Sequence, residues 1–113
     1  MKIKNLTQKF TINVDIAESI WKRMKGLSFS KRRNLFFVFD IEREWEIWMF
    51  GMKFPINIVY VNSKKVVVDV KEAQPLKFFK PETWSIYKPF KPCKYILETT
   101  DKRFNIGDKL FWV

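Results

Sequence analysis

The sequence has no histidine and only one cysteine among its 113 residues. Histidine is the commonest general base and the commonest transition-metal ligand, so its absence removes most acid–base and metal-centred chemistry. Cys93 cannot form an intramolecular disulfide, and without a histidine partner we expect it to be a small buried residue rather than a nucleophile. A structural zinc site is disfavoured on the same grounds. We therefore predict no metal, no cofactor and no catalytic residue.

Glycine and long apolar runs are also scarce. The three glycines, Gly26, Gly51 and Gly107, lie far apart, so no glycine-rich phosphate loop is present, and no serine nucleophile elbow occurs. The first residues lack the apolar region of a signal peptide, and no run reaches the length of a membrane span. These absences favour a cytoplasmic protein. The predominance of lysine over arginine is typical of a thermophilic prokaryotic source.

What the chain does contain is a large apolar fraction and a strong positive charge. Its length predicts a single domain over residues 1–113, and its 47% hydrophobic and 18% aromatic content supports a packed core. The net charge of +10 is concentrated in two basic blocks, residues 22–33 and 75–95, and the remainder of the chain is neutral. Each block is either a solvated loop or part of a surface that binds an anion.

The most apolar stretch, Trp45–Asn62, predicts the middle of the fold. Consecutive apolar residues over Ile47–Phe50 and Ile58–Val61 are typical of strands that are covered on both faces. A tight turn near Ser63 should lead into a partner strand that begins at Lys65. Along that strand the alternation places three valines on one face, namely Val66, Val68 and Val70, and three residues on the other, namely Val67, Asp69 and Lys71.

One helix is expected, over about Ile16–Lys25. Asp15 followed by Glu18 resembles a capping box, and Gly26 is a suitable C-terminal stop. The predicted buried face of this helix consists of four apolar residues at helical spacing, Ile16, Ile20, Met24 and Leu27.

Further strands are predicted at both ends of the chain, and a long loop before the last two. The alternating residues of Ile3–Val14 indicate one or two strands, and Asn34–Asp40 indicates another. Lys94–Thr100 and Lys109–Val113 are expected as the last strands, joined by a turn over Asn105–Asp108. Between them and the central stretch, four prolines exclude regular structure from 75–92, whose large apolar side chains, Phe90 included, should pack over the central strands. We therefore predict a mainly β single-domain barrel or two-sheet sandwich, jelly-roll-like, of about seven short strands with one short helix near the N-terminus.

The order of several landmarks resembles that of the domain-of-unknown-function family number 192, a group of small, mainly β prokaryotic proteins. The landmarks are Arg23–Leu27, Leu35–Phe39, Trp48–Met49, Pro55–Asn62, Pro75, Tyr87, Pro92–Glu98 and Gly107–Asp108. The resemblance implies a barrel or jelly-roll-like fold and carries no activity, substrate or cofactor. Polar residues usual in the family are replaced here by Phe50–Met52, Ser28, Ser30 and Asn57, so a polar site that these positions form in relatives would be altered or absent.

Two functions remain open. In the first, the chain is a binding or interaction module for an anionic ligand such as single-stranded nucleic acid or another polyanion, because cationic grooves with aromatic stacking platforms bind single strands. The candidate residues of this surface are Lys31, Arg32, Arg33, Lys77, Lys80, Trp84, Tyr87, Lys88 and Lys91. Inward packing of the aromatics, with lysines that only solubilise the loop, is the alternative explanation for the second block.

In the second function, carboxylates such as Asp69, Glu98 and Asp108 serve an enzyme that acts on a small polar or carbohydrate substrate. Structural roles, such as a turn hydrogen bond by Asp108, are the simpler expectation for these residues. A pocket lined by convergent carboxylates would favour the enzyme, and a continuous basic surface would favour the binder.

Overall fold

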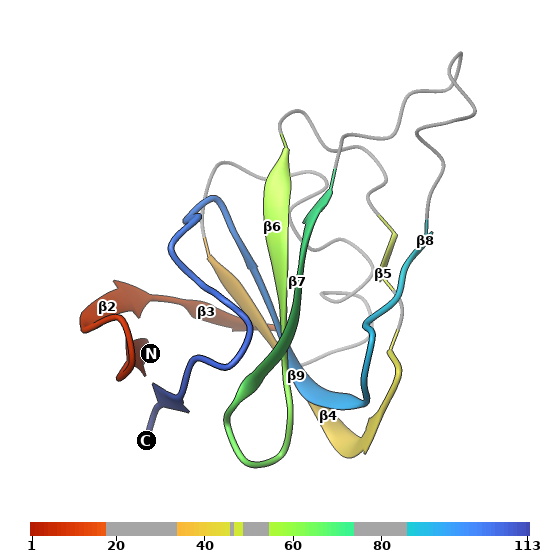
Figure 1. Ribbon diagram of the computed structural model, residues 1–113, viewed down its shortest axis with the longest axis horizontal. Coiled ribbons are helices and arrows are strands. Elements are labelled where there is room, and N and C mark those ends of the chain that lie inside the picture. The colour runs from red at the N-terminus through yellow and green to blue at the C-terminus, as the bar shows by residue number, and fades with distance from the viewer. Residues whose placement is uncertain (18–33, 46, 49–54, 74–85) are drawn as a thin grey trace.

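Figure 1 shows the computed structural model, which describes residues 1–17, 34–45, 47–48, 55–73 and 86–113. These residues form ten short strands in three sheets. The three-stranded sheet has the order β10 (Leu110–Phe111), β1 (Lys2–Asn5) and β2 (Phe10–Asn13). The five-stranded sheet has the order β3 (Asp15–Ala17), β4 (Leu35–Arg43), β9 (Cys93–Thr99), β6 (Ile56–Val61) and β7 (Val67–Ala73). A short pair joins β5 (Ile47–Trp48) to β8 (Ile86–Tyr87).

The second half of the predicted central stretch is β6, and all six of its residues are buried. Its complete burial confirms that this uninterrupted apolar run is covered on both faces. β6 lies between β7 and β9 and pairs antiparallel with each. The middle strand of the sheet is β9, which pairs with β4 on its other side. Figure 1 shows the strand pair β5–β8 on the opposite side of this sheet from the two chain termini.

The five-stranded sheet has a hydrophobic cluster on each face. One cluster combines side chains of β4, β6, β7 and β9 with those of the three-stranded sheet, and it includes Ile3, Ile12, Phe36, Val59, Leu97 and Leu110. The other lies on the opposite face and includes Leu35, Phe37, Ile58, Tyr60, Cys93 and Ile96. Trp45 packs against this second cluster, stacked on Phe39 with 4.3 Å between ring centroids. The three-stranded sheet therefore packs as a layer on one face of the five-stranded sheet.

The mainly β class is confirmed, and of the two predicted architectures, a barrel or a two-sheet sandwich, the described strands form packed sheets and not a closed barrel. The five-stranded sheet begins at β3 and ends at β7, and the described strands do not close it into a ring. A single bridge between Val66 and Lys109 connects the start of β7 to the chain before β10. The described chain has ten strands where the sequence predicted about seven, because several form only two- to four-residue pairs.

The predicted start of the helix is also wrong, and the described residues contain no helix. Asp15, Ile16 and Ala17 form β3, which pairs in parallel with the first residues of β4. Ile16 is 37% exposed and not on a buried helix face. The backbone hydrogen bonds offered by the edge of β4 outweigh a helical pattern of modest propensity. The rest of the predicted helix, with Ile20, Met24 and Leu27, lies outside the described residues.

The hairpin of β6 and β7 is confirmed, but the predicted alternation along β7 is wrong. Tyr60 pairs with Asp69 and Val61 pairs with Val67, so Val68 is an additional residue in a β-bulge. A bulge reverses the face of every residue beyond it. Val67 and Val70 therefore pack in one cluster and Val68 in the other. The predicted turn over Asn105–Asp108 is present, with φ of 94° at Gly107, which favours glycine.

Most of the long loop lies outside the described residues, so its predicted packing over the central strands stays a prediction. Its end forms β8, which pairs with β5 in the first half of the central stretch. Phe90, which we expected to be buried, is exposed. In the described parts of the chain, no helix is long and apolar enough to cross a bilayer.

Candidate functional site

Only part of the predicted ligand surface falls within the described residues. Lys31, Arg32, Arg33, Lys77, Lys80 and Trp84 lie outside them. Tyr87 is in β8, and Lys88 and Lys91 are exposed on the segment that follows. The Lys88 ammonium lies 4.0 Å from the Glu44 carboxylate. Whether the two basic blocks share one face is therefore still a prediction.

The fold assembles a different group of lysines and aromatic residues, which we call the lysine–aromatic cluster. Its residues come from three separate segments: the β6–β7 turn, the start of β9, and β10 with the residues on either side of it. Its members are Lys64, Lys65, Lys94, Tyr95, Lys109, Phe111 and Trp112.

Three aromatic rings in mutual contact form the base of the cluster. The Phe36 ring in β4 is fully buried and lies parallel to the Tyr95 ring, with 5.5 Å between centroids. The Trp112 ring meets both edge-on, at 5.0 Å from Phe36 and 4.8 Å from Tyr95. Such offset and edge-to-face contacts hold aromatic rings in fixed orientations. Tyr95 and Trp112 are half-buried, so each keeps part of its surface in solvent.

Lys65 has an unusual backbone that directs its side chain towards these rings. Its φ is 64°, in the left-handed region that costs a non-glycine residue roughly 1 kcal/mol or more. Asn62 holds the turn, because its side-chain Oδ1 accepts hydrogen bonds from the backbone N–H groups of Lys64 and Val66, each at 3.0 Å. The Lys65 ammonium lies 4.7 Å from the Trp112 ring centroid and 5.4 Å from that of Phe111. It also donates a hydrogen bond to the Trp112 carbonyl at 3.2 Å.

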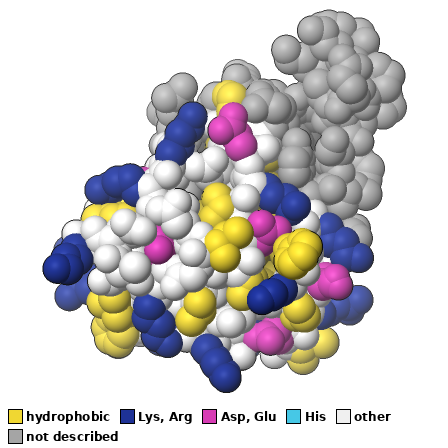
Figure 2. All heavy atoms as spheres, viewed as in Figure 1, with side chains coloured by type: hydrophobic (Ala, Val, Ile, Leu, Met, Phe, Trp, Pro, Cys, Tyr) yellow, Lys and Arg dark blue, Asp and Glu magenta, His cyan; other side chains and the backbone are white. Residues whose placement is uncertain are grey.

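Three further lysines, Lys64, Lys94 and Lys109, belong to the segments that meet at this contact. The Lys109 ammonium donates to the Lys64 carbonyl at 2.6 Å, and the Lys94 ammonium lies 5.9 Å from the Tyr95 ring centroid. Hydrogen bonds from Ser63, together with the charges of Lys64 and Lys94, hold the pKa of Glu42 below its usual value. Glu42 therefore stays ionised and offsets part of the positive charge. Among the described residues on the face that Figure 2 shows, lysines and arginines are interspersed with acidic and apolar side chains.

The carboxylates singled out in the sequence are mostly occupied by structural bonds. Asp108 is buried and accepts hydrogen bonds from Asn5 Nδ2 at 2.7 Å, Gln8 Nε2 at 3.1 Å and the backbone N–H of Asn105 at 2.9 Å. The expected turn hydrogen bond by Asp108 is thus confirmed. Asp69, also buried, accepts from the backbone N–H groups of Val70 and Phe90.

Asp69 and Glu98 share one face of the five-stranded sheet and are separated by β6. Glu98 is opposite Ile58, and Asp69 is opposite Tyr60, two residues further along β6. Two strand spacings and two residues place their Cα atoms about 12 Å apart. Across the described residues, no three potential ligands are grouped for a metal ion.

Cys93 is fully buried, and burial raises the pKa of its thiol to about 11. A thiol with so high a pKa is almost entirely protonated at neutral pH and is a poor nucleophile. The prediction of a small buried cysteine is confirmed.

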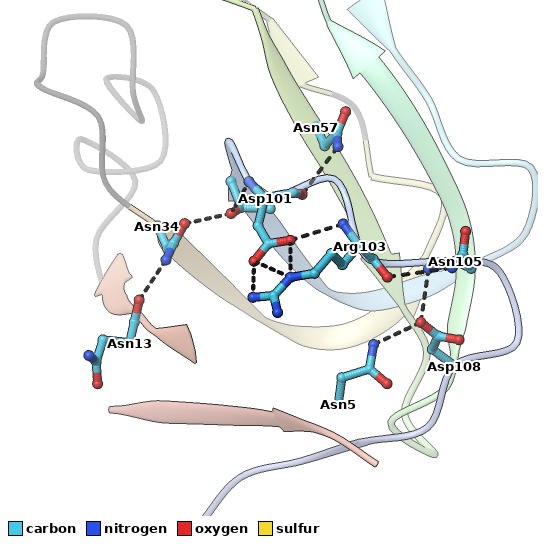
Figure 3. A network of polar contacts seen from close by, with 9 residues as sticks. Asn5, Asn13, Asn34, Asn57, Asp101, Arg103, Asn105 and Asp108 are labelled. Carbon is cyan, nitrogen blue, oxygen red and sulfur yellow. Dashed lines mark hydrogen bonds and ion pairs between the residues drawn. The ribbon is translucent and has the colours of Figure 1, made fainter. Parts of the chain in front are cut away.

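A polar network at the opposite end of the five-stranded sheet from the β6–β7 turn fixes the segment after β9 (Figure 3). The Arg103 guanidinium forms an ion pair with the Asp101 carboxylate at 2.8 Å and lies 3.9 Å from the Phe10 ring centroid. The hydrogen bonds that it donates hold the pKa of Asp101 below its usual value. Asn57 is buried and donates to the Asp101 carbonyl at 3.2 Å. Thr99 Oγ1 donates to Asn34 Oδ1, whose amide donates to the Asn13 carbonyl.

The lysine–aromatic cluster was not predicted from the sequence. Its local signals are two adjacent lysines in a turn, a Lys94–Tyr95 pair and a C-terminal Phe111–Trp112 pair, each of them common. Pairings between segments far apart in the sequence bring these residues together: β1 pairs with β10, Val61 of β6 is opposite Tyr95 of β9, and Val66 is bridged to Lys109.

Comparison with known proteins places the chain among uncharacterised proteins. The family model DUF192, described as "Uncharacterized ACR, COG1430", matches residues 2–110. A UPF0127 protein of Pyrococcus furiosus is 32% identical over 113 residues, which cover 93% of this chain and 90% of the relative. A UPF0127 protein of Thermococcus sibiricus is 32% identical over 112 residues, which cover 91% of this chain and 68% of the relative. Relatives from such heat-loving archaea fit the lysine-rich composition.

Two crystal structures share the fold. A protein of unknown function from Novosphingobium aromaticivorans superposes with a TM-score of 0.81 at 17% sequence identity, covering 98% of this chain and 83% of that one. A Sinorhizobium meliloti protein described as a "putative transcription regulator" superposes with a TM-score of 0.78 at 20% identity, covering 97% of this chain and 91% of that one. At these identities the likeness concerns the fold alone.

Proposed function

The chain belongs to the DUF192 family of uncharacterised proteins, and from that premise we propose that it is a binding module whose lysine–aromatic cluster takes single-stranded nucleic acid. The single observation that carries the proposal is the position of the Lys65 ammonium over the Trp112 and Phe111 rings. Aromatic faces that are partly in solvent offer stacking surfaces to bases, and nearby ammonium groups offer contacts to phosphates.

The strained turn at Lys65 supports the same proposal. A left-handed backbone at a non-glycine residue persists only where its surroundings compensate for the strain. At this position the strain places an ammonium group beside two rings and within a group of three other lysines. Phe111 is 45% exposed, so its ring is accessible to a ligand.

The residues predicted from the sequence would extend this surface. Lys88 and Lys91 precede the start of β9, where Lys94 and Tyr95 belong to the cluster. The basic residues of the two blocks that lie outside the described chain add positive charge that would favour any polyanion. The carboxylate enzyme remains the weaker alternative, because Asp69 and Glu98 are separated by β6 and Asp108 is fixed by three hydrogen bonds.

The proposal can be tested by mapping the contact surface with NMR. Unlabelled oligothymidylate of about 10 nucleotides, within the range of site sizes for small single-strand-binding folds, would be titrated into isotope-labelled protein. We expect the largest shifts in the Lys65 and Tyr95 amides and in the Trp112 indole N–H. Shifts confined to the polar network around Asp101, or no shifts at low salt, would contradict the proposal.

A further inference from the structure

Phe90 has a side chain that the fold leaves in solvent. It is 82% exposed, and among the described residues only the C-terminal Val113 is a more exposed large apolar side chain. An isolated exposed apolar residue is common on protein surfaces. Phe90 differs from the usual case because its backbone N–H is bonded to the buried Asp69 carboxylate, while its ring lies in solvent.

The residue that holds the Phe90 backbone is Asp69 in β7. The backbone N–H of Phe90 donates to Asp69 Oδ2 at 2.8 Å, and the other oxygen of Asp69 accepts from the N–H of Val70 at 2.9 Å. The Lys71 ammonium lies 3.5 Å from Asp69 Oδ2. Pro89, immediately before Phe90, is buried. The segment is thus attached to the sheet at the Phe90 backbone and at the residue before it, which reduces the entropy that Phe90 would lose on contact with a ligand.

The charges around Phe90 favour an anionic partner. Lys88 and Lys91 flank it in the sequence and are both exposed. Tyr95 is the fifth residue after Phe90, so their Cα atoms are at most about 18 Å apart. Single strands occupy about 4–16 nucleotides on small single-strand-binding folds, and a strand of that length can span this separation.

We propose that Phe90 is a second stacking site for the same single strand that the lysine–aromatic cluster binds, with Lys88 and Lys91 on the adjacent phosphates. This inference rests on the proposed function. It adds that one strand contacts both places, so the contribution of Phe90 depends on the length of the strand.

The test measures the affinity of a fluorescently labelled thymidine mononucleotide and of a labelled oligothymidylate of about 16 nucleotides for wild-type protein and the Phe90→Ala variant. We expect Phe90→Ala to weaken binding of the longer probe by about tenfold, because loss of one stacked base costs about that order of affinity. Binding of the shorter probe to the lysine–aromatic cluster should be unchanged, since a single base cannot occupy both sites. Phe90→Trp should bind the longer probe at least as well as wild type, whereas Phe90→Leu should resemble Phe90→Ala.

Ile106→Ala is the matched control, because Ile106 is a 66% exposed apolar residue on another turn. It should bind both probes as wild type does. Equal affinity of wild type and Phe90→Ala for the longer probe would overturn the second stacking site and leave the proposed function standing. A wild-type protein that binds neither probe would overturn both. Full rescue by Phe90→Leu would overturn stacking as the role of Phe90.

Discussion

At the residue scale, short polar side chains determine how the loops are attached to the sheets. Asp108 connects the β1–β2 hairpin to the turn before β10, and Asp69 connects the segment before β9 to β7. Asp101 and Arg103 fix the segment after β9. Asp69 and Asp108 were candidates for catalysis in the sequence, and the structure shows the hydrogen bonds that occupy them. The sequence could not distinguish the two roles, because a structural and a catalytic aspartate are the same residue in different surroundings.

Replacement of Asp108 by alanine should lower the free energy of unfolding by about 3 kcal/mol, because it leaves buried donors without their charged acceptor. Urea denaturation of wild type and variant measures this difference. Asp40→Ala, which removes the same charge from an exposed position of β4, should change it by less than about 0.5 kcal/mol. Equal effects of the two substitutions would show that the hydrogen bonds of Asp108 contribute little.

The ion pair of Asp101 predicts a specific pH dependence. Since the pKa of Asp101 is lower in the folded protein than in the unfolded chain, its stabilisation is fully present above about pH 4 and is lost as the pH falls through the folded value. The melting temperature of Asp101→Asn should therefore lie below that of wild type near neutral pH, and the difference should shrink at lower pH. Thermal melts between about pH 7 and pH 2 measure it. A difference that grows on acidification would contradict the assignment.

At the element scale, the sequence predicted the features that depend on the burial of apolar residues and missed those that depend on how the strands pair. The apolar run Ile58–Val61 is buried on both faces, and the hairpin that follows it has the expected turn. The start of the predicted helix at Ile16 failed because an edge of β4 was available to Asp15–Ala17. The alternation along β7 failed at Val68, because a bulge depends on the partner strand and has no sequence pattern of its own.

The role of β6 as a doubly covered strand predicts a large cost for truncating it. Ile58→Ala should lower the free energy of unfolding by roughly 2–5 kcal/mol, since Ile58 is fully buried and its removal leaves a cavity. Chemical denaturation at constant m-value measures the change. Ile106→Ala, at an exposed turn position, should cost less than about 0.5 kcal/mol. A cost for Ile58→Ala as small as that of Ile106→Ala would mean that β6 is not in a closely packed core.

At the scale of the whole molecule, the candidate site is a product of chain topology. The lysine–aromatic cluster requires the C-terminal strand to return beside β1 and the β6–β7 turn to meet it, contacts that lie far apart in the sequence. The sequence did predict the kind of surface, lysines beside aromatic rings, but it assigned that surface to the two basic blocks. The part of that assignment that concerns Lys31, Arg32 and Arg33 stays a prediction. Replacing these three residues by alanine should lower the magnitude of the slope of log affinity against log salt for polyanion binding.

The salt dependence of single-strand binding tests the central claim most directly. A labelled oligothymidylate would be titrated at several salt concentrations with wild type, with the Lys64→Ala/Lys94→Ala double variant and with the control Lys102→Ala. The ammonium of Lys102 lies 3.9 Å from the Glu72 carboxylate, away from the cluster. If Lys64 and Lys94 each contact a phosphate, the slope of log affinity against log salt should fall in magnitude by about 1.4 in the double variant and remain unchanged in the control. Absence of binding at low salt, or one slope for all three proteins, would contradict the account.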